Sequence, residues 1–199
     1  MKKSIRFFFI LRQRIERKIF HYLFKKNNLS LLPVDNNSIV LLGDSQTQFF
    51  EVPRYYKNKN IRNRGVSGDR TDQVLDRLGE ITFGKPKKIF IEIGVNDLLQ
   101  GISVEITFKN INLIISGIEK DSPETKIYVQ NILPTEEHLQ FFSQNGVLVL
   151  PLIKILNEQI LALCIMKNIT HINLFDGFYL NNGLNPRYDC GDGLHLNHK

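Results

Sequence analysis

Short apolar runs alternate with longer amphipathic stretches through most of this chain of 199 residues. Four runs have the length and the β-branched or aromatic content of buried strands, and they lie at 39–42, 88–93, 126–133 and 169–175. A fifth, weaker strand is predicted at 61–64. Apolar residues at three- and four-residue steps predict helices over 71–81, 104–119 and 152–166, with a short one at 47–50. Strands separated in this way are typical of a parallel sheet with helices on both faces.

Residues 1–30 depart from this alternation and predict one basic amphipathic helix, over 4–26, ahead of a domain over 31–199. The apolar stripe of this leader consists of Phe8, Leu11, Ile15, Ile19 and either Tyr22 or Leu23. The net charge of +6 is concentrated here, because residues 1–28 hold nine basic side chains and one acidic one. That is +8, and it leaves −2 for the rest of the chain. The body is nearly neutral, so we expect no nucleic-acid partner.

The leader fits two roles. It can make a peripheral contact with an anionic membrane, or its stripe can pack on the body, and amphipathicity alone does not choose between them. A signal peptide is less expected, because the apolar run at 7–11 is short and no small-residue cleavage site follows it. No apolar run approaches the roughly 18 residues of a membrane span, so we expect no transmembrane segment. We expect a cytoplasmic protein that is peripheral to the membrane if the leader binds one.

The two cysteines, Cys164 and Cys190, have no metal-ligand spacing, and we expect both to be reduced. Cys164 lies in an apolar helical pattern that favours a small buried side chain, whereas Cys190 lies in a loop. No glycine motif has dinucleotide or phosphate-loop spacing. We therefore expect neither a metal nor a cofactor.

Ser45 is the first candidate for chemistry. It ends the motif Gly43-Asp44-Ser45, between the strand at 39–42 and a short predicted helix. A serine on such a turn is lifted clear of the sheet and lies at a helix N-terminus, where negative charge is favoured. The alternative is a serine that only caps the helix, which is the commoner outcome for this motif taken alone.

Two further motifs offer hydrogen-bond donors. The motif at 94–97 follows the third predicted strand, and the amide of Asn96 can stabilise a developing oxyanion. The motif at 65–69 follows the second strand, and Gly68 there allows backbone N–H groups to approach a ligand closely. Each motif by itself is also compatible with an ordinary turn.

The last motif, Asp192-Gly193-Leu194-His195, pairs a carboxylate with an imidazole. A carboxylate that holds one ring nitrogen leaves the other available to take a proton from a hydroxyl. A surface Asp–His pair is the alternative, and a metal site lacks further ligands, since His171 and His198 are poorly placed. Because the carboxyl ends of parallel strands meet at one edge of a sheet, the four motifs together predict a complete hydrolase site.

In this order the motifs resemble the sequence blocks of the SGNH (GDSL-type) hydrolases, over about residues 38–197. The segments at 66–71 and 192–196 are similar to the branch that contains platelet-activating-factor acetylhydrolase catalytic subunits and bacterial acyl hydrolases. The resemblance implies a flavodoxin-like three-layer α/β/α sandwich with strand order 2-1-3-4-5 and no cofactor. It implies a triad of Ser45, Asp192 and His195, and an oxyanion hole made by the backbone of Ser45 and Gly68 and the side chain of Asn96.

The implied activity is hydrolysis of a carboxylic ester with a short, acetyl-type acyl group. The substrate would be an O-acetylated carbohydrate, a lysophospholipid or another small ester, and a non-catalytic module that binds an anion is the alternative. The segment at 133–151, with His138, Phe141 and Phe142, is expected to overhang the site. Family members usually continue into a closing helix, whereas this sequence stops at Lys199, so we expect either a truncated chain or a leader that covers that face.

Overall fold

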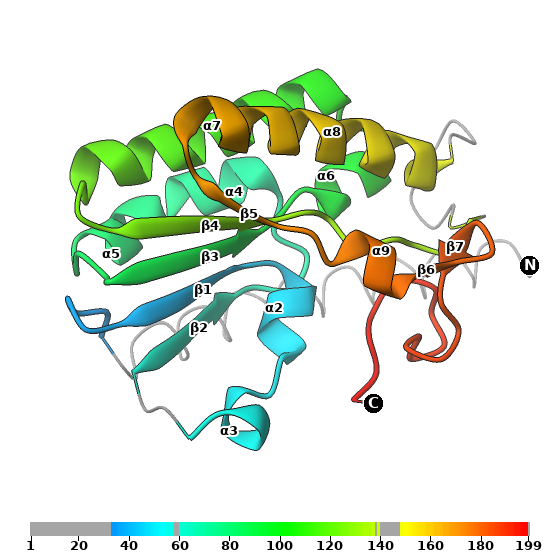
Figure 1. Cartoon of the computed structure of the whole chain (residues 1–199), viewed down its shortest axis with the longest axis horizontal. Helices are drawn as coiled ribbons and strands as arrows, with labels where there is room; N and C mark the ends of the chain where they lie inside the picture. The colour runs from blue at the N-terminus through cyan, green and yellow to red at the C-terminus, as the bar shows by residue number, and fades with distance from the viewer. Residues whose placement is uncertain (1–32, 58–59, 138, 140–147, 199) are drawn as a thin grey trace, which may run out of the picture. The chain divides into compact units, whose positions relative to one another are not determined.

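The computed structural model divides the chain into two units, Met1–Pro33 and Val34–Lys199. The structure describes residues 33–57, 60–137, 139 and 148–198 (Figure 1). The predicted leader helix over 4–26 lies outside the described residues, as do His138, Phe141 and Phe142 of the expected overhang. The roles predicted for them therefore stay predictions. The helices and strands of the described residues all belong to the second unit.

Five strands form one parallel sheet in the order β2-β1-β3-β4-β5, which confirms the predicted fold class. They are β1 (Ile39–Gly43), β2 (Ile61–Gly65), β3 (Lys88–Glu92), β4 (Lys126–Gln130) and β5 (Thr170–Ile172). Alternate residues of the central strands point to one face and are almost fully buried there, namely Val40, Leu42, Ile89, Ile91 and Val129. This period of two defines the core face of the sheet.

Helices cover that core face. Figure 1 shows α4 (Thr71–Asp76), α5 (Leu78–Thr82), α6 (Val95–Leu99), α7 (Val104–Asp121) and α8 (Val149–Lys167) along one side of the sheet. The predicted stripe of α7 is buried against it, with Ile111, Ile114, Ile115 and Ile118 at most 1% exposed. The short helices α2 (Ser45–Phe49) and α3 (Val52–Tyr55) connect β1 to β2 on the other side (Figure 1).

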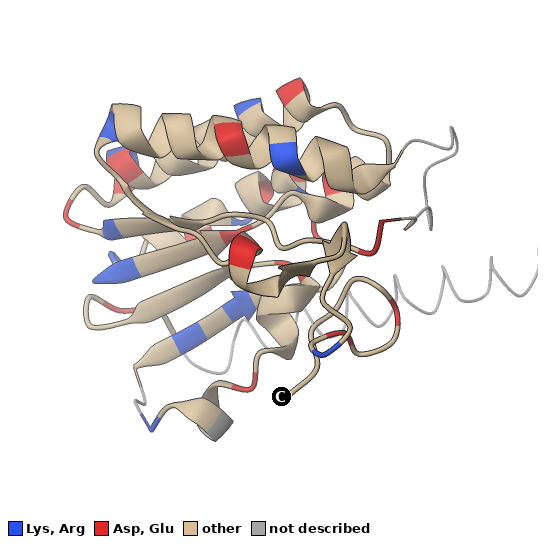
Figure 2. Cartoon of the chain, turned by 45° about the vertical axis from the view of Figure 1, so that its right-hand side comes forward, with Lys and Arg blue, Asp and Glu red and all other residues tan. Residues whose placement is uncertain are grey.

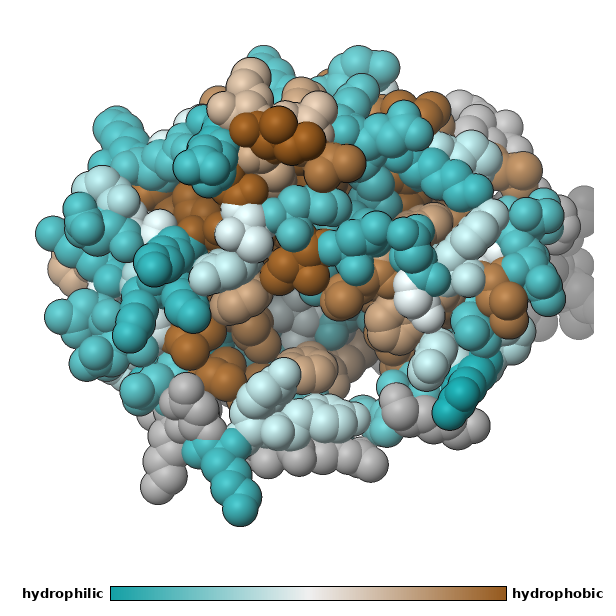
Figure 3. All heavy atoms as spheres, viewed as in Figure 1, coloured by the Kyte–Doolittle hydropathy of each residue, from teal (hydrophilic) through white to brown (hydrophobic). Residues whose placement is uncertain are grey.

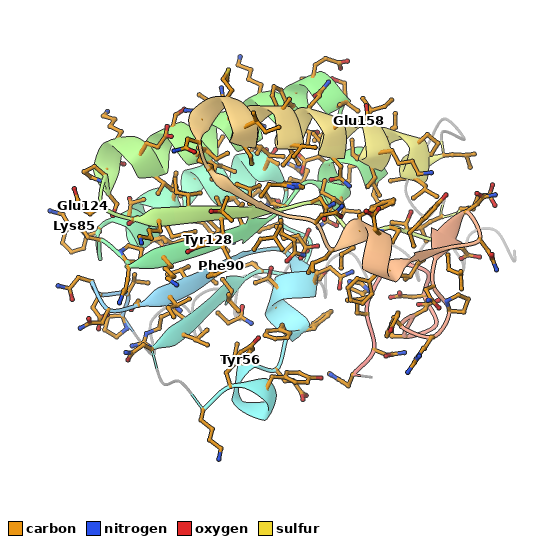
Figure 4. All side chains as sticks on the ribbon, viewed as in Figure 1. Tyr56, Lys85, Phe90, Glu124, Tyr128 and Glu158 are labelled. Carbon is orange, nitrogen blue, oxygen red and sulfur yellow. The ribbon has the colours of Figure 1, made fainter. Side chains whose placement is uncertain are left out.

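The second face of the sheet carries larger and less buried side chains. Phe90 on β3 stacks on Tyr128 of β4 with their ring centroids 4.4 Å apart, and Figure 4 shows the two residues on neighbouring strands. Basic residues lie at the amino ends of β3 and β4 and along β2, and acidic residues are spread over the helices and loops (Figure 2). This mixing of signs agrees with the nearly neutral body that the sequence predicts.

Helix α8 is long and apolar enough to cross a membrane by length and composition. It contains no unbroken apolar run of that length, because Lys154 and Glu158 interrupt it. Its inner face is nevertheless buried in the domain core through Ile153, Leu156, Ile160, Leu163 and Cys164. Figure 3 shows hydrophobic residues among hydrophilic ones over α8 and the strands below it. We interpret α8 as a core helix of the domain, because long core helices can have the same length and apolar composition as a membrane span.

Three predicted boundaries were wrong for identifiable reasons. The helix expected over 71–81 is two helices, because the chain leaves helical geometry at Arg77 (φ −106°, ψ 3°). The fourth strand ends at Gln130, because the backbone N–H and C=O of Ile132 pair with the side chain of Asn157 on α8. The fifth strand ends at Ile172, because the backbone N–H groups of Leu174 and Phe175 donate to the side chain of Asn131.

Several short elements have no counterpart in the predicted pattern. Helix α9 (Phe175–Phe178) and a two-stranded antiparallel ribbon, β6 (Tyr179–Leu180) with β7 (Gly183–Leu184), precede the C-terminal loop. Helices α3 and α6 were also not predicted. All of them are five residues or shorter, too short for a periodic pattern to identify.

Candidate active site

Ser45 is the first residue of α2, directly beyond the end of β1, and it is buried. The residue that caps the helix is Asp44, whose carboxylate accepts a hydrogen bond from the backbone N–H of Gln46 at 3.0 Å. The capping role that was the alternative for Ser45 therefore falls to its neighbour. The hydroxyl of Ser45 lies instead 2.7 Å from Nε2 of His195, from the other end of the chain.

His195 is in turn held by Asp192. Its Nδ1 lies 2.6 Å from one carboxylate oxygen of Asp192, and the other oxygen accepts hydrogen bonds from the backbone N–H groups of His195 and Leu194. Burial acts to raise the pKa of Asp192, but the hydrogen bonds from the His195 ring, His195 N–H and Leu194 N–H outweigh it and lower the pKa to about 2. The carboxylate is therefore charged at neutral pH and can stabilise a protonated imidazole.

The loop that carries this pair is organised by Asp189. One carboxylate oxygen of Asp189 accepts hydrogen bonds from the backbone of Gly191, Asp192 and Gly193. Gly191 and Gly193 both have positive φ angles, of 104° and 72°, which glycine adopts at little cost. The glycines flanking Asp192 thus allow the tight curl that presents the acid to His195.

Gly68 and Asn96 lie beyond the ends of β2 and β3, the two strands that flank β1. Gly68 has a φ of 80° and occupies a turn closed by a hydrogen bond from Asp69 N–H to Val66 C=O. The Asn96 side-chain nitrogen donates to the backbone C=O of Asp69 at 3.0 Å and to the Asp44 carboxylate at 3.3 Å. Asn96 therefore bridges the loop after Gly68 and the residue before Ser45.

A buried ion pair, which the sequence analysis missed, lies beneath these loops. Arg77 donates from Nε to the Asp69 carboxylate at 2.8 Å and from Nη2 to the backbone C=O of Gly43 at 3.1 Å. Its side chain is 2% exposed and that of Asp69 is fully buried. The sequence feature that could have indicated this ion pair is a basic residue, Arg77, within a predicted apolar helix. Arg77 lies at the break between α4 and α5, which explains why its side chain points inward.

A second buried contact fixes α4 against α6. The carboxylate of Asp97 accepts hydrogen bonds from the backbone N–H of Thr71 at 2.9 Å and from its hydroxyl at 2.5 Å. Asn110 on α7 donates to the same hydroxyl at 3.0 Å. Asp97 thus positions the short helix on which Asn96 lies.

Acidic groups are concentrated below the site. Burial, together with the charges of Asp69 and Asp97, raises the pKa of Asp44 to about 7. Burial and the nearby Asp44 also raise the pKa of Glu92, at the end of β3, well above its usual value. A protonated carboxyl is the less costly form of such a buried acid.

The thiol of Cys190 and the side chains of Asp192 and His195 offer metal-ligand atoms within 4.8 Å of one another. Burial, followed by the charge of Asp192, raises the pKa of Cys190, whereas metals bind the thiolate form. Asp192 already bonds to Nδ1 of His195, and Nε2 of His195 bonds to Ser45. We therefore assign Asp192 and His195 to the triad geometry, which does not include Cys190. Cys190 and the buried Cys164 are both free thiols.

A parallel α/β sheet with a hydroxyl, an imidazole and a carboxylate in succession at its carboxyl edge defines the class of α/β serine hydrolases. The chain belongs to the GDSL-like lipase/acylhydrolase family, whose model matches residues 41–199. This assignment confirms the predicted family and makes the protein an ester hydrolase, and it does not favour the alternative of an inert anion-binding module.

Similar proteins agree with the family. Platelet-activating factor acetylhydrolase IB subunit alpha2 of Homo sapiens is 29% identical over 164 residues, which cover 79% of this chain and 68% of that protein. A GDSL-like lipase from Bacteroides thetaiotaomicron has the same fold, with a TM-score of 0.75, 22% identity and coverage of 89% of each chain. The acetyl xylan esterase AlAXEase matches with a TM-score of 0.62, 17% identity and coverage of 80% of this chain and 91% of its own.

Proposed function

We propose that the protein hydrolyses carboxylic esters with a short acyl group, through an acyl-enzyme intermediate on Ser45. The observation that carries the proposal is the contact of 2.7 Å between the Ser45 hydroxyl and Nε2 of His195, with Asp192 on the opposite ring nitrogen. A hydroxyl is a weak nucleophile unless an adjacent base takes its proton, and this geometry supplies the base.

In the first half of the reaction, His195 accepts the proton of Ser45 as the serine oxygen attacks the ester carbonyl. Asp192 keeps the ring in the required tautomer and stabilises its positive charge. His195 then gives the proton to the oxygen of the departing alcohol. In the second half, water attacks the acyl-enzyme with the same base, and the carboxylic acid leaves.

The negative oxygen of the tetrahedral intermediate would be held by the backbone N–H groups of Ser45 and Gly68 and by the amide of Asn96. In the resting site both N–H bonds of that amide are directed at acceptors, the Asp69 carbonyl and the Asp44 carboxylate. The contact to Asp44 is the longer one, at 3.3 Å, and we propose that it is exchanged for the oxyanion. A protonated Asp44 would favour this exchange, because it adds no negative charge beside the oxyanion.

A short acyl group is supported by two similar proteins whose names specify acetyl esters, an acetylhydrolase and an acetyl xylan esterase. The proposed substrate is an O-acetylated carbohydrate, a lysophospholipid or another small ester.

The test combines labelling with a substrate series. A fluorophosphonate probe is expected to label the wild type at Ser45 and to leave Ser45→Ala unlabelled. Among p-nitrophenyl esters, the acetyl ester is expected to have a higher kcat/KM than the butyryl and longer esters. Labelling elsewhere would refute Ser45 as nucleophile, and a preference for long chains would refute the short acyl group.

A further inference from the structure

Four exposed aromatic side chains lie on α2, α3 and their connections, beside the candidate triad. Phe49, Phe50, Tyr55 and Tyr56 are between 38% and 54% exposed, and we call these four side chains, which all lie within residues 49–56, the aromatic platform. Phe50 stacks on Tyr55 with ring centroids 5.3 Å apart and is 6.2 Å from the ring of Tyr56. Exposed apolar clusters of this kind often mark binding surfaces.

The platform adjoins the catalytic base directly. The ring of Phe49 meets the ring of His195 edge-on, with centroids 5.4 Å apart. At its far end, the Tyr55 hydroxyl donates to the backbone C=O of His198 at 3.4 Å, and His198 is 3.9 Å from Glu51. His198 therefore lies against the Tyr55 end of the platform. Figure 4 shows Tyr56 beside α3, next to α2.

This position identifies which part of an ester the platform would meet. If the proposed function is correct, the departing alcohol must bring its oxygen within hydrogen-bond reach of Nε2 of His195. The oxyanion donors lie on other loops, beyond β2 and β3. The alcohol is therefore on the His195 side of the reacting carbon, where Phe49 begins the platform.

The chemistry of the platform favours a sugar as that alcohol. All four side chains are flat rings and two carry phenolic hydroxyls, so the surface is apolar on its faces and polar at its edges. A sugar ring has the complementary division, with C–H groups on its faces and hydroxyls around its rim. An alkyl chain is better enclosed by a concave aliphatic pocket, and the platform contains no aliphatic side chain.

We infer that Phe49, Phe50, Tyr55 and Tyr56 form the subsite for the alcohol part of the ester, and that this alcohol is a sugar ring. The inference rests on the proposed function, and it makes the protein a deacetylase of O-acetylated carbohydrate. Rigid aromatic side chains suit such a subsite, because holding them still costs little conformational entropy.

Three acetyl esters that differ only in the alcohol test the inference on the full-length chain. They are ethyl acetate, octyl acetate and an O-acetylated methyl glycoside. Phe50→Ala and Tyr56→Ala are each expected to lower kcat/KM for the acetylated glycoside about tenfold, which corresponds to about 1.4 kcal/mol of lost contact. Hydrolysis of ethyl acetate is expected to change less than about twofold, since its alcohol is too small to reach the platform.

Phe83 provides the matched control. It is 90% exposed at the end of α5, just before β3 begins, and therefore lies near the edge of the sheet opposite to Ser45. Phe83→Ala removes the same kind of side chain, and we expect it to leave all three rates unchanged.

The other outcomes overturn the inference. An equal loss on all three esters would show that the platform only supports the fold of the site. A loss confined to octyl acetate would assign the platform to an alkyl chain, and no loss on any ester would remove it from substrate binding. Labelling of Ser45 by fluorophosphonate distinguishes these results from failure of the proposed function, in which neither labelling nor hydrolysis of any ester would occur.

Discussion

Ser45 and His195 meet at 2.7 Å, but the parts of the molecule that hold them differ. Ser45 and Asn96 rest on the ends of central strands, above the buried ion pair of Arg77 with Asp69. His195 rests on a C-terminal loop that Asp189 organises through hydrogen bonds to exposed or half-buried backbone groups. The half that carries Ser45, the proposed nucleophile, is part of the core, whereas the half that carries His195, the proposed base, is an attached loop.

This difference predicts how substitutions in each half affect stability and rate. Buried charges that bond across several loops are costly to disturb, because each partner left behind keeps its desolvation penalty. An exposed loop can open locally without unfolding the domain. We therefore expect substitutions in the first half to affect stability and rate together, and substitutions in the second half to affect mainly the rate.

The largest effect is expected for Ser45→Ala, which removes the proposed nucleophile. Loss of such a residue lowers kcat by several orders of magnitude, on the order of 10⁴-fold or more. The unfolding midpoint is expected to stay near that of the wild type, because Asp44 and not Ser45 caps α2. The measurements are kcat on p-nitrophenyl acetate and a thermal melt, and activity above about a hundredth of wild type would exclude Ser45.

Asp192→Asn is expected to lower kcat by about 10²–10⁴-fold, because an amide presents the wrong hydrogen-bond partner to His195 Nδ1. The wild-type carboxyl, with a pKa of about 2, stays ionised throughout the range in which activity is assayed. Steady-state kinetics at pH 7–8 measure the loss. A variant with full activity would mean that the backbone alone orients His195.

Arg77→Met is expected to cost about 3–5 kcal/mol of unfolding free energy, because it removes the cation that pairs with the buried Asp69. Asp189→Ala is the matched substitution in the other half, and we expect it to cost less than about 1 kcal/mol while still lowering kcat. Urea unfolding and kinetics on both variants compare the two halves directly. Equal destabilisation by the two substitutions would remove the distinction between them.

Asn96→Ala is expected to lower kcat about a hundredfold with little change in KM, since the proposed oxyanion contact forms mainly in the transition state. Steady-state kinetics over a range of p-nitrophenyl acetate concentrations separate the two constants. If KM alone rises, Asn96 binds the substrate in its ground state.

The last prediction concerns the dependence of stability on pH. The pKa of Asp44 is raised to about 7 in the folded protein, so the folded state favours the protonated carboxyl. The free energy of unfolding is therefore higher at low pH and falls as the pH rises from about 4 through 7. Asp44→Asn is expected to flatten this decline, whose limiting slope is about 1.4 kcal/mol per pH unit for one proton. Chemical unfolding across this pH range provides the measurement, and Glu92→Gln is expected to act in the same direction. An unchanged slope in both variants would mean that this pair does not titrate there.

The sequence predicts the meeting of Ser45, Asp192 and His195, because strand ends and short motifs are local features of the chain. The sheet order, which is not local, was implied only by the resemblance to a known family. The sequence does not predict the break at Arg77 or the early end of β4 at Gln130. Both depend on side chains that reach across the fold, from Arg77 to Gly43 and from Asn157 to Ile132. The sequence also does not predict that Asp44 and not Ser45 caps α2, because both residue types suit the N-cap position.

The break at Arg77 makes α4 a spacer of fixed length. Each residue of a helix turns the chain by about 100°, so the six residues Thr71–Asp76 set the direction in which Arg77 points. Insertion or deletion of one residue would rotate the guanidinium away from Asp69 and Gly43 while leaving the composition of the helix almost unchanged. We therefore expect relatives that keep this ion pair to tolerate substitutions within α4 and to preserve its length.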